Sequence, residues 1–83
     1  MVQFPIRLRS FHDIQALAAL AAERPYRIQV GDGRICVGAK SFLSIFCLNL
    51  RGNLQLVADC PEEELPLLRQ RLGSIALQST TAL

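Results

Sequence analysis

The chain has 83 residues, of which 51% are hydrophobic and 19% are charged, and its formal net charge is +2. A chain of this length forms one small domain with a thin core, which favours a two-layer architecture. No uncharged stretch reaches the roughly 18 apolar residues that a membrane-spanning helix needs, so a membrane span is excluded. The nine basic residues are scattered and form no basic stripe, which argues against nucleic-acid binding.

The cysteines and the single histidine exclude a further class of site. Cys36, Cys47 and Cys60 lack C-x-x-C spacing, and one histidine is too few for an ordinary Cys/His metal site. Because each cysteine lies among apolar residues, we expect three buried thiols in a reducing compartment. Arg7 and Arg9 follow the first apolar residues, which reverses the order of a signal peptide. We therefore expect a cytoplasmic protein that uses no metal and no cofactor.

The first predicted elements are a strand and a helix. Residues 2–8 alternate and are rich in strand formers, and Pro5 among them suits an edge strand or a bend. Ser10 and Asp13 form an S-x-x-D capping box, which predicts the start of a helix. Apolar residues then recur at helical spacing on one face, and Pro25 ends the helix.

A hairpin is predicted next along the chain. Residues 26–30 and 34–37 have the alternating pattern of strands. Asp32 and Gly33 between them favour a tight turn, because Asp-Gly supplies the positive φ that a primed turn requires. Strands 2 and 3 should therefore pair with each other directly.

The C-terminal part is predicted to hold a strand, a helix and a tail. Residues 54–59 form the fourth strand, and residues 60–72 form a helix that begins with three glutamates. Pro66 lies past the first turn of this helix, so we expect an irregular start. Gly73 ends the helix, and residues 74–83 are predicted to be a C-terminal tail after a domain of residues 1–73.

A short helix is predicted between strands 3 and 4, at residues 42–48. Ser41 precedes it and is expected to accept a backbone hydrogen bond as its N-cap. Ile45 and Leu48 are three residues apart and can face the core. Two helical turns cannot bury every side, so we expect three large residues to form an exposed partner surface: Phe42, Leu43 and Phe46. The alternative is that the long helices or the tail cover them.

The resulting order, β-α-β-β-α-β-α, predicts an α+β fold. We expect a four-stranded, mostly antiparallel sheet with three helices on one face.

The segment "AKSFLSIFCLNL", residues 39–50, resembles the Ala-Lys-Ser-aliphatic-Met-Gly segment of HPr, the small phosphocarrier of the bacterial sugar phosphotransferase system. The likeness extends to "DGR" before it, to the strand after it and to the acidic start of the terminal helix. It covers roughly residues 2–72. The resemblance implies the open-faced β-sandwich of HPr for this chain, and at most a phosphoryl carrier rather than a turnover enzyme. It also implies that strand 1 lies inside the sheet, between strands 3 and 4, or in an equivalent arrangement that keeps strands 2 and 3 as a hairpin.

The resemblance also implies a phosphoacceptor role for His12, which lies close to the position of the family's active histidine. The family motif His-Ala-Arg-Pro is not kept, because the chain has Asp13, Ile14 and Gln15 after the histidine. A transferred phosphoryl group needs donors and a cation, and Asp13 adds like-charge repulsion. Arg24 or Arg51 could replace the missing arginine if the fold brings either near.

Ser41 matches the serine that a dedicated kinase phosphorylates in HPr of many Gram-positive bacteria, a form that binds a transcriptional regulator. A simple N-cap role is the alternative. By resemblance, the docking surface for partner enzymes consists of Lys40, Phe42, Leu43 and Phe46, with Ser44 in place of a glycine.

Three functions remain open at this point. The first is a regulatory or interaction module with degenerate histidine phosphotransfer. The second is a phosphocarrier that passes a phosphoryl group through His12 from enzyme I to enzyme II components. The third is a plain binding module. The expected partners are proteins, among them a serine kinase, a transcriptional regulator or a second copy bound through residues 42–46, and neither nucleic acid nor membrane.

Overall fold

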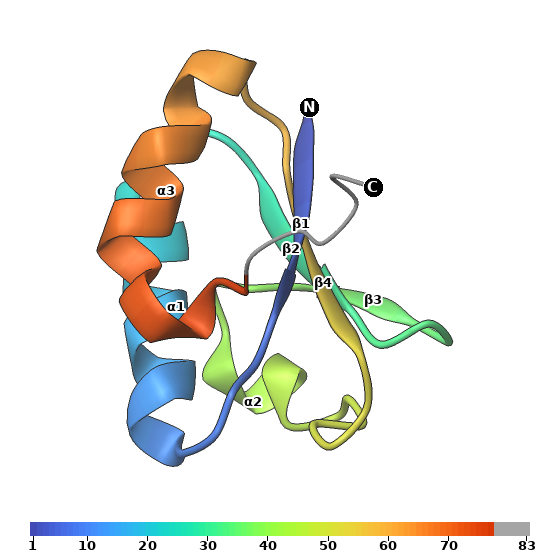
Figure 1. Ribbon diagram of the computed structural model, residues 1–83. Coiled ribbons are helices and arrows are strands. Elements are labelled where there is room, and N and C mark those ends of the chain that lie inside the picture. Colours follow the sequence, from blue (N-terminus) through green and yellow to red (C-terminus); the bar gives the residue numbers. More distant parts are fainter. Residues whose placement is uncertain (78–83) are drawn as a thin grey trace.

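The structure is a computed structural model that describes residues 1–77. Its elements in chain order are β1 (Val2–Ile6), α1 (Phe11–Glu23), β2 (Ile28–Gly31), β3 (Cys36–Gly38), α2 (Phe42–Ile45), β4 (Leu54–Ala58), the 3₁₀ turn η1 (Glu62–Glu64), α3 (Leu65–Leu72) and the 3₁₀ turn η2 (Gly73–Ile75). The predicted α+β class, the four-stranded antiparallel sheet and the three helices are confirmed. The helices lie on one side of the sheet, and within residues 1–77 no helix covers the other face (Figure 1).

The sheet has the order β1-β4-β2-β3, so β1 is an edge strand. The expected position of strand 1 between strands 3 and 4 is therefore wrong. Pro5 supplies the physical reason. Its carbonyl accepts the N–H of Leu77 at 3.0 Å on the side away from β4, so its nitrogen faces the same outer edge. The N–H that proline lacks is thus missing where no strand ladder needs it.

The predicted hairpin between β2 and β3 is confirmed. Val30 pairs with Val37, and the Asp32 N–H donates to the Ile35 carbonyl at 3.1 Å to close the turn. Gly33 has φ +94°, a conformation that residues with a Cβ rarely adopt. The short Asp-Gly sequence was therefore sufficient to place this turn.

The predicted Ser10 cap of α1 is confirmed, but the Asp13 side chain reaches one residue further back than a capping box requires, to Arg9 instead of Ser10. Ser10 Oγ accepts the Asp13 N–H at 3.3 Å, and the Asp13 carboxylate accepts the Arg9 N–H at 3.0 Å. The helix ends at Glu23, just before Pro25. The hydrogen bonds of Ser10 and Asp13 hold the first turn of α1 in place, and so orient the side chains of its first residues.

The predicted irregular start of the last helix is confirmed, because η1 precedes α3 and Pro66 is the second residue of α3. Gly73 ends the helix with φ +59°. Of the predicted tail, residues 74–77 lie against β1, where the Ile75 carbonyl accepts the Arg7 N–H at 2.9 Å. Residues 78–83 lie outside the described part of the chain.

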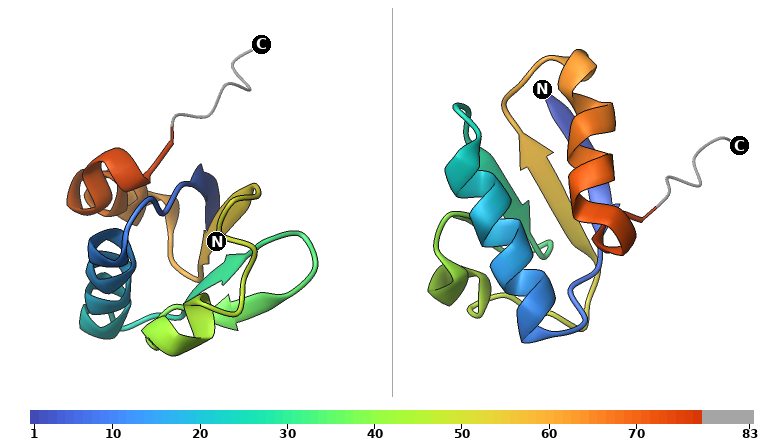
Figure 2. Two further views of the ribbon diagram at one scale, coloured as in Figure 1. Left: turned by 90° about the horizontal axis from the view of Figure 1, so that it is seen from below. Right: turned by 90° about the vertical axis from the view of Figure 1, so that its left-hand side faces the viewer.

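The core lies between the sheet and the helices. Its fully buried side chains come from every layer, and they include Leu17 of α1, Val30 and Leu56 of the sheet, Ile45 of α2 and Leu68 of α3. An Arg71–Glu23 ion pair joins α3 to α1 at the surface. Figure 2 shows α1 and α3 side by side over the sheet, with α2 beside the N-terminal end of α1.

Candidate interaction surface

Three phenylalanine rings meet where α2 lies beside the start of α1. Phe11 is the first residue of α1, and its ring stacks on Phe46 with 5.9 Å between centroids and an interplanar angle of 11°. Phe42 meets both rings edge-on, at 5.7 Å from Phe11 and 6.4 Å from Phe46. These are the offset and edge-to-face arrangements that aromatic quadrupoles favour. The rings therefore support one another without being covered.

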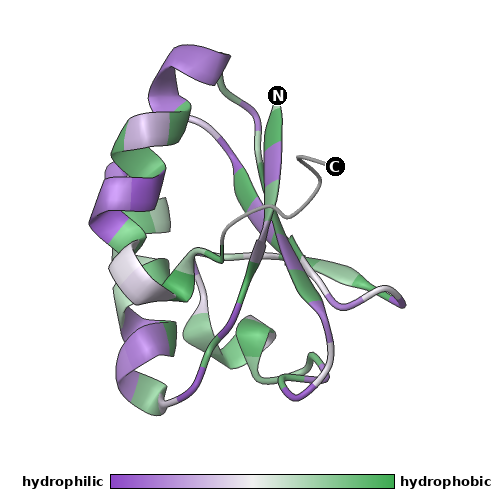
Figure 3. Ribbon diagram, in the orientation of Figure 1, coloured by the Kyte–Doolittle hydropathy of each residue, from purple (hydrophilic) through white to green (hydrophobic). Residues whose placement is uncertain are grey.

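All three phenylalanines remain partly exposed to solvent. The exposed fractions are 48% for Phe11, 39% for Phe42 and 47% for Phe46, and neighbouring Leu43 is 67% exposed. We call these four residues the apolar patch. The predicted exposure of Phe42, Leu43 and Phe46 is confirmed, and so is the burial of Ile45 and Leu48. In Figure 3 α2 is mostly apolar, with Ser44 as its one polar residue, which is why one face alone cannot hide its large side chains.

Phe11 is the member of the apolar patch that the sequence analysis missed. It lies three residues before the buried Ile14, so helical spacing puts it on the core-facing side of α1. The sequence could have indicated Phe11, because the apolar stripe of α1 that contains Ile14 already begins at the first residue of the helix. Only the packing of α2 against α1 shows that Phe11 contacts Phe42 and Phe46 rather than the core.

α2 is shorter than predicted and is capped differently. It ends at Ile45, because Cys47 and Leu48 donate to carbonyls three residues back and so tighten the chain into a 3₁₀-like turn. Ser41 occupies the N-cap position in an extended conformation, but its side chain makes no capping hydrogen bond. The expected capping role of the Ser41 hydroxyl is therefore wrong, and only its carbonyl serves the helix, by accepting the N–H groups of Ser44 and Ile45.

Asp32 fixes the chain that follows α2. Its carboxylate accepts three backbone N–H groups: from Asn49 at 2.9 Å, from Arg34 at 2.8 Å and from Ile35 at 3.1 Å. These bonds, the one from Asn49 foremost, hold the pKa of Asp32 well below its ordinary value. The sequence predicted a turn residue here. The contact with Asn49 is long-range and ties the hairpin to the loop between α2 and β4.

His12 lies in the first turn of α1, next to Phe11, and is exposed. Within residues 1–77 no side chain forms a hydrogen bond with it. Arg51 lies in the loop after α2, and its backbone N–H donates to the Asn49 side chain. Arg24 follows His12 by twelve residues along the chain, which corresponds to roughly 18 Å along a helix axis. Neither candidate arginine pairs with His12.

Arg24 is held in a separate cluster beyond the C-terminal end of α1. Its guanidinium donates to Glu64 at 3.1 Å, and the Tyr26 hydroxyl donates to the same oxygen at 2.8 Å. Desolvation and the bond to Glu64 raise the pKa of Tyr26 to about 12. This cluster stabilises the contact between α1 and the segment that leads into α3.

Two of the three cysteines are exposed, so the prediction of three buried thiols is wrong. Cys36 lies on edge strand β3, on the sheet face that carries no helix, and Cys47 follows α2. Cys60 alone is buried, and desolvation raises the pKa of its thiol. Apolar neighbours in sequence did not imply burial, because the residues near α2 are themselves exposed.

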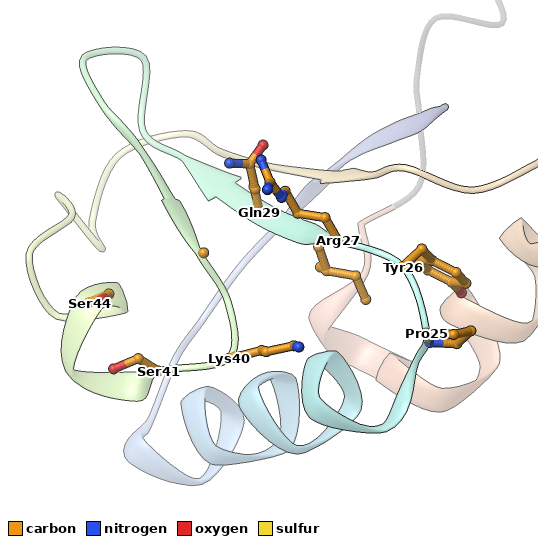
Figure 4. Close-up of a pocket in the computed structure, with 9 residues that line it drawn as sticks. Pro25, Tyr26, Arg27, Gln29, Lys40, Ser41 and Ser44 are labelled. Atoms are coloured by element: carbon orange, nitrogen blue, oxygen red, sulfur yellow. The ribbon is translucent and has the colours of Figure 1, made fainter.

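Lys40 and Ser41 line a pocket on the other side of the segment that enters α2. The pocket has a volume of about 520 Å³, and Figure 4 shows the Lys40 side chain extending through it toward Pro25. Lys40 and Ser41 are exposed, as are all four residues of the apolar patch. Five of the predicted site residues thus lie on one exposed stretch, residues 40–46, and the packing of α2 against α1 places this stretch beside the helix start that carries His12.

No family model matches the chain, and no curated protein matches it either. In the described part of the chain, none of the helices combines the length and the apolarity needed to cross a membrane.

Proposed function

We propose that the chain is an HPr-like regulatory or interaction module, related to the sugar phosphotransferase system, with degenerate histidine phosphotransfer. The observation that carries the proposal is the apolar patch, formed by α2 and the first residue of α1 beside an exposed His12. The element order and the uncovered sheet face agree with an open-faced β-sandwich. The partners proposed by resemblance are enzyme I, enzyme II components, a serine kinase and a transcriptional regulator.

The apolar patch has the features of a protein docking surface. It presents three aromatic rings and one leucine on a small domain, and aromatic side chains supply most anchor residues in protein interfaces. The rings are ordered by mutual stacking, so little side-chain entropy is lost when a partner covers them. A homodimer through residues 42–46 is the alternative use of the same surface.

His12 is poorly equipped for rapid phosphotransfer. An imidazole that takes a phosphoryl group needs cations and N–H donors to stabilise the charge on the transferred group. In residues 1–77 no guanidinium is bonded to His12, and the carboxylate of Asp13 is fixed one residue away by the Arg9 N–H. Like charge at this distance opposes the incoming phosphoryl group. We therefore expect slow or absent transfer.

Ser41 is the better candidate for modification. It is exposed, its hydroxyl makes no capping hydrogen bond, and Lys40 precedes it. A phosphate here would add negative charge beside a lysine and directly before Phe42 of the apolar patch. Phosphorylation of Ser41 would thus alter the docking surface at its edge.

A functional phosphocarrier is the second candidate, and the exposure of His12 in the first turn of α1 favours it. Incubation with phosphoenolpyruvate and enzyme I, followed by an assay for acid-labile phosphate, separates the two. We expect little or no label. Rapid labelling that disappears in His12→Ala would replace the first proposal by the second.

The serine proposal has its own assay. Incubation with ATP and the HPr serine kinase should give acid-stable phosphate on the wild type and on Ser44→Ala, and none on Ser41→Ala. Ser44 is the matched control because it lies three residues away on α2. Equal labelling of the wild type and Ser41→Ala would refute Ser41 as the phosphorylated residue.

A further inference from the structure

The two edges of the sheet differ in how their backbone groups are used. At the β1 edge the Pro5 carbonyl accepts the Leu77 N–H at 3.0 Å, and the Arg7 N–H donates to the Ile75 carbonyl at 2.9 Å. The end of the described chain therefore covers that edge. β3 forms the opposite edge (Figure 1), and within residues 1–77 no strand pairs with its outer side. An open edge of this kind is a template for a further strand.

The unpaired backbone groups of β3 belong to Cys36 and Gly38. The Ala39 N–H donates to the Ile28 carbonyl at 2.9 Å, so the main chain of Ala39 faces β2. Because this direction alternates along an antiparallel strand, Cys36 and Gly38 point their N–H and C=O groups outward. Both residues are exposed, and the exposure of a glycine is exposure of its backbone. These donors and acceptors are therefore accessible to an added strand.

The side chains along this edge are apolar and only partly covered. Val37 pairs with the fully buried Val30, so it lies on the sheet face that carries the helices, where it is partly buried. Ile35 lies two residues earlier on the same face and is 45% exposed. Apolar side chains of an added strand would cover both residues. On the other face a Cβ at Gly38 would meet no atom within 4 Å, so that side is open.

The charged residues beside β3 are basic. Arg34 precedes the strand and Lys40 follows it, and residues 33–58 contain no acidic residue. The nearest carboxylate in the sequence belongs to Asp32, whose buried side chain already accepts three backbone N–H groups. Arg34 bonds to Asp32 but keeps 70% of its side chain exposed, and within residues 1–77 Lys40 forms no ion pair. A partner would therefore meet positive charge at both ends of β3.

A second copy of the chain matches this edge less well than an acidic partner does. The antiparallel register that uses all the outward groups sets Cys36 opposite Gly38 of the second copy. The same register sets Arg34 opposite Lys40 of the second copy. Like charges directly opposite each other destabilise paired strands, whereas opposite charges stabilise them.

We infer that β3 binds an extended acidic segment of a partner protein as an added antiparallel strand. The main chain of the segment supplies the hydrogen bonds, and its alternate apolar side chains cover Ile35 and Val37. Its acidic residues lie opposite Arg34 and Lys40. The inference does not depend on the proposed docking function, because none of the four apolar-patch residues belongs to β3.

The probe is the peptide Glu-Val-Thr-Val-Thr-Val-Glu with both ends blocked. Paired antiparallel with residues 34–40, it puts its valines on the helix-bearing face and its glutamates opposite the two cations. Amide hydrogen exchange of the ¹⁵N-labelled full chain, followed by NMR, is the readout. At saturating peptide the amides of Cys36 and Gly38 should exchange more than about tenfold more slowly. The Ala39 amide is already bonded to Ile28 and should change little.

Charge variants test the class of partner. Lys40→Glu should weaken binding of this peptide roughly fivefold or more, because it replaces an attraction by a repulsion. Arg7→Glu makes the same change of charge beside the β1 edge and should leave affinity within about twofold. The peptide with lysine in place of both glutamates should bind Lys40→Glu more tightly than it binds the wild type. Equal weakening by the two variants would show that only net charge matters and would refute the inference.

A backbone variant tests the edge itself. Cys36→Pro removes an outward N–H that no ladder uses, as Pro5 does in β1, so the domain should stay folded. It should lose peptide binding, whereas Cys36→Ser keeps the N–H and should bind as the wild type does. Should the proline variant unfold, the charge variants above still decide the question.

Two further results would overturn the inference. One is unchanged exchange of the Cys36 and Gly38 amides at saturating peptide. The other is their protection without peptide in a chain that sediments as a dimer, which would assign the edge to a second copy. Leu43→Asp, in the apolar patch, should retain peptide binding, so a failed docking surface and a failed β3 edge give different results.

Discussion

Replacing Phe46 by aspartate separates docking from folding. Phe46 is 47% exposed and stacks on Phe11, whereas its neighbour Ile45 is fully buried. A charged side chain at position 46 can reach water, and the same change at position 45 places a charge in the core. Phe46→Asp therefore removes part of the apolar patch, whereas Ile45→Asp disrupts the core, although the two residues are adjacent in sequence.

The cost to stability follows from the hidden half of the Phe46 side chain. A buried aromatic side chain covers roughly 200 Å², so about 100 Å² is lost here, worth at most ~2.5 kcal/mol of unfolding free energy. A chain of this length typically has about 4 to 12 kcal/mol of stability. Phe46→Asp should thus remain folded with a melting temperature roughly 10 °C lower. Ile45→Asp should lose more than about 4 kcal/mol.

Urea denaturation followed by circular dichroism measures both stabilities, and sedimentation or calorimetry measures association with a partner protein or a second copy. An aromatic anchor contributes about 2 kcal/mol or more, so Phe46→Asp should weaken association by roughly 30-fold. The reasoning is refuted if Phe46→Asp unfolds the domain as Ile45→Asp does and the wild type associates with nothing. Phe46 would then belong to the core.

Three further outcomes are expected. Asp32→Asn should lower the urea midpoint at neutral pH. Because the folded pKa of Asp32 lies below its ordinary value of 3.8, the ionised carboxylate stabilises the fold fully above that pH, and this stabilisation is lost as the pH falls further. The stability of the variant should therefore depend less on pH in the acid range. Ser10→Ala should cost about 1 kcal/mol in urea denaturation and Ser41→Ala much less, because only Ser10 makes a capping hydrogen bond; equal costs would contradict this. A thiol reagent should modify two cysteines of the native protein rapidly and Cys60 only on unfolding, and rapid modification of all three would show that Cys60 is not buried.

The features that the sequence predicted well are local. The Ser10 cap needs only Ser10 and Asp13, and the hairpin turn needs only Asp32 and Gly33, so neighbouring residues carry the whole signal. Pro5 also indicated an edge strand through its missing N–H. That backbone constraint was correct, and the expectation that strand 1 is internal was not.

The features that the sequence did not predict depend on long-range packing. Phe11 joins the apolar patch because α2 folds back against the start of α1. Asp32 fixes Asn49 across 17 residues. Cys36 is exposed because it lies on edge strand β3, on the sheet face that carries no helix. The pocket around Lys40 likewise combines residues from two separate segments, 25–29 and 38–44, whose proximity no local pattern encodes.

We propose that the chain docks its partners through the apolar patch, as an HPr-like module. NMR titration of the ¹⁵N-labelled chain with enzyme I, and separately with the HPr serine kinase, tests it most directly. We expect saturable changes at residues 10–12 and 41–48 with at least one of these proteins. We also expect their loss in Leu43→Asp and their retention in Ile35→Asp, which changes an exposed residue of the β2–β3 hairpin outside the apolar patch. Absence of binding to both proteins, or changes confined to the uncovered sheet face, would contradict the claim.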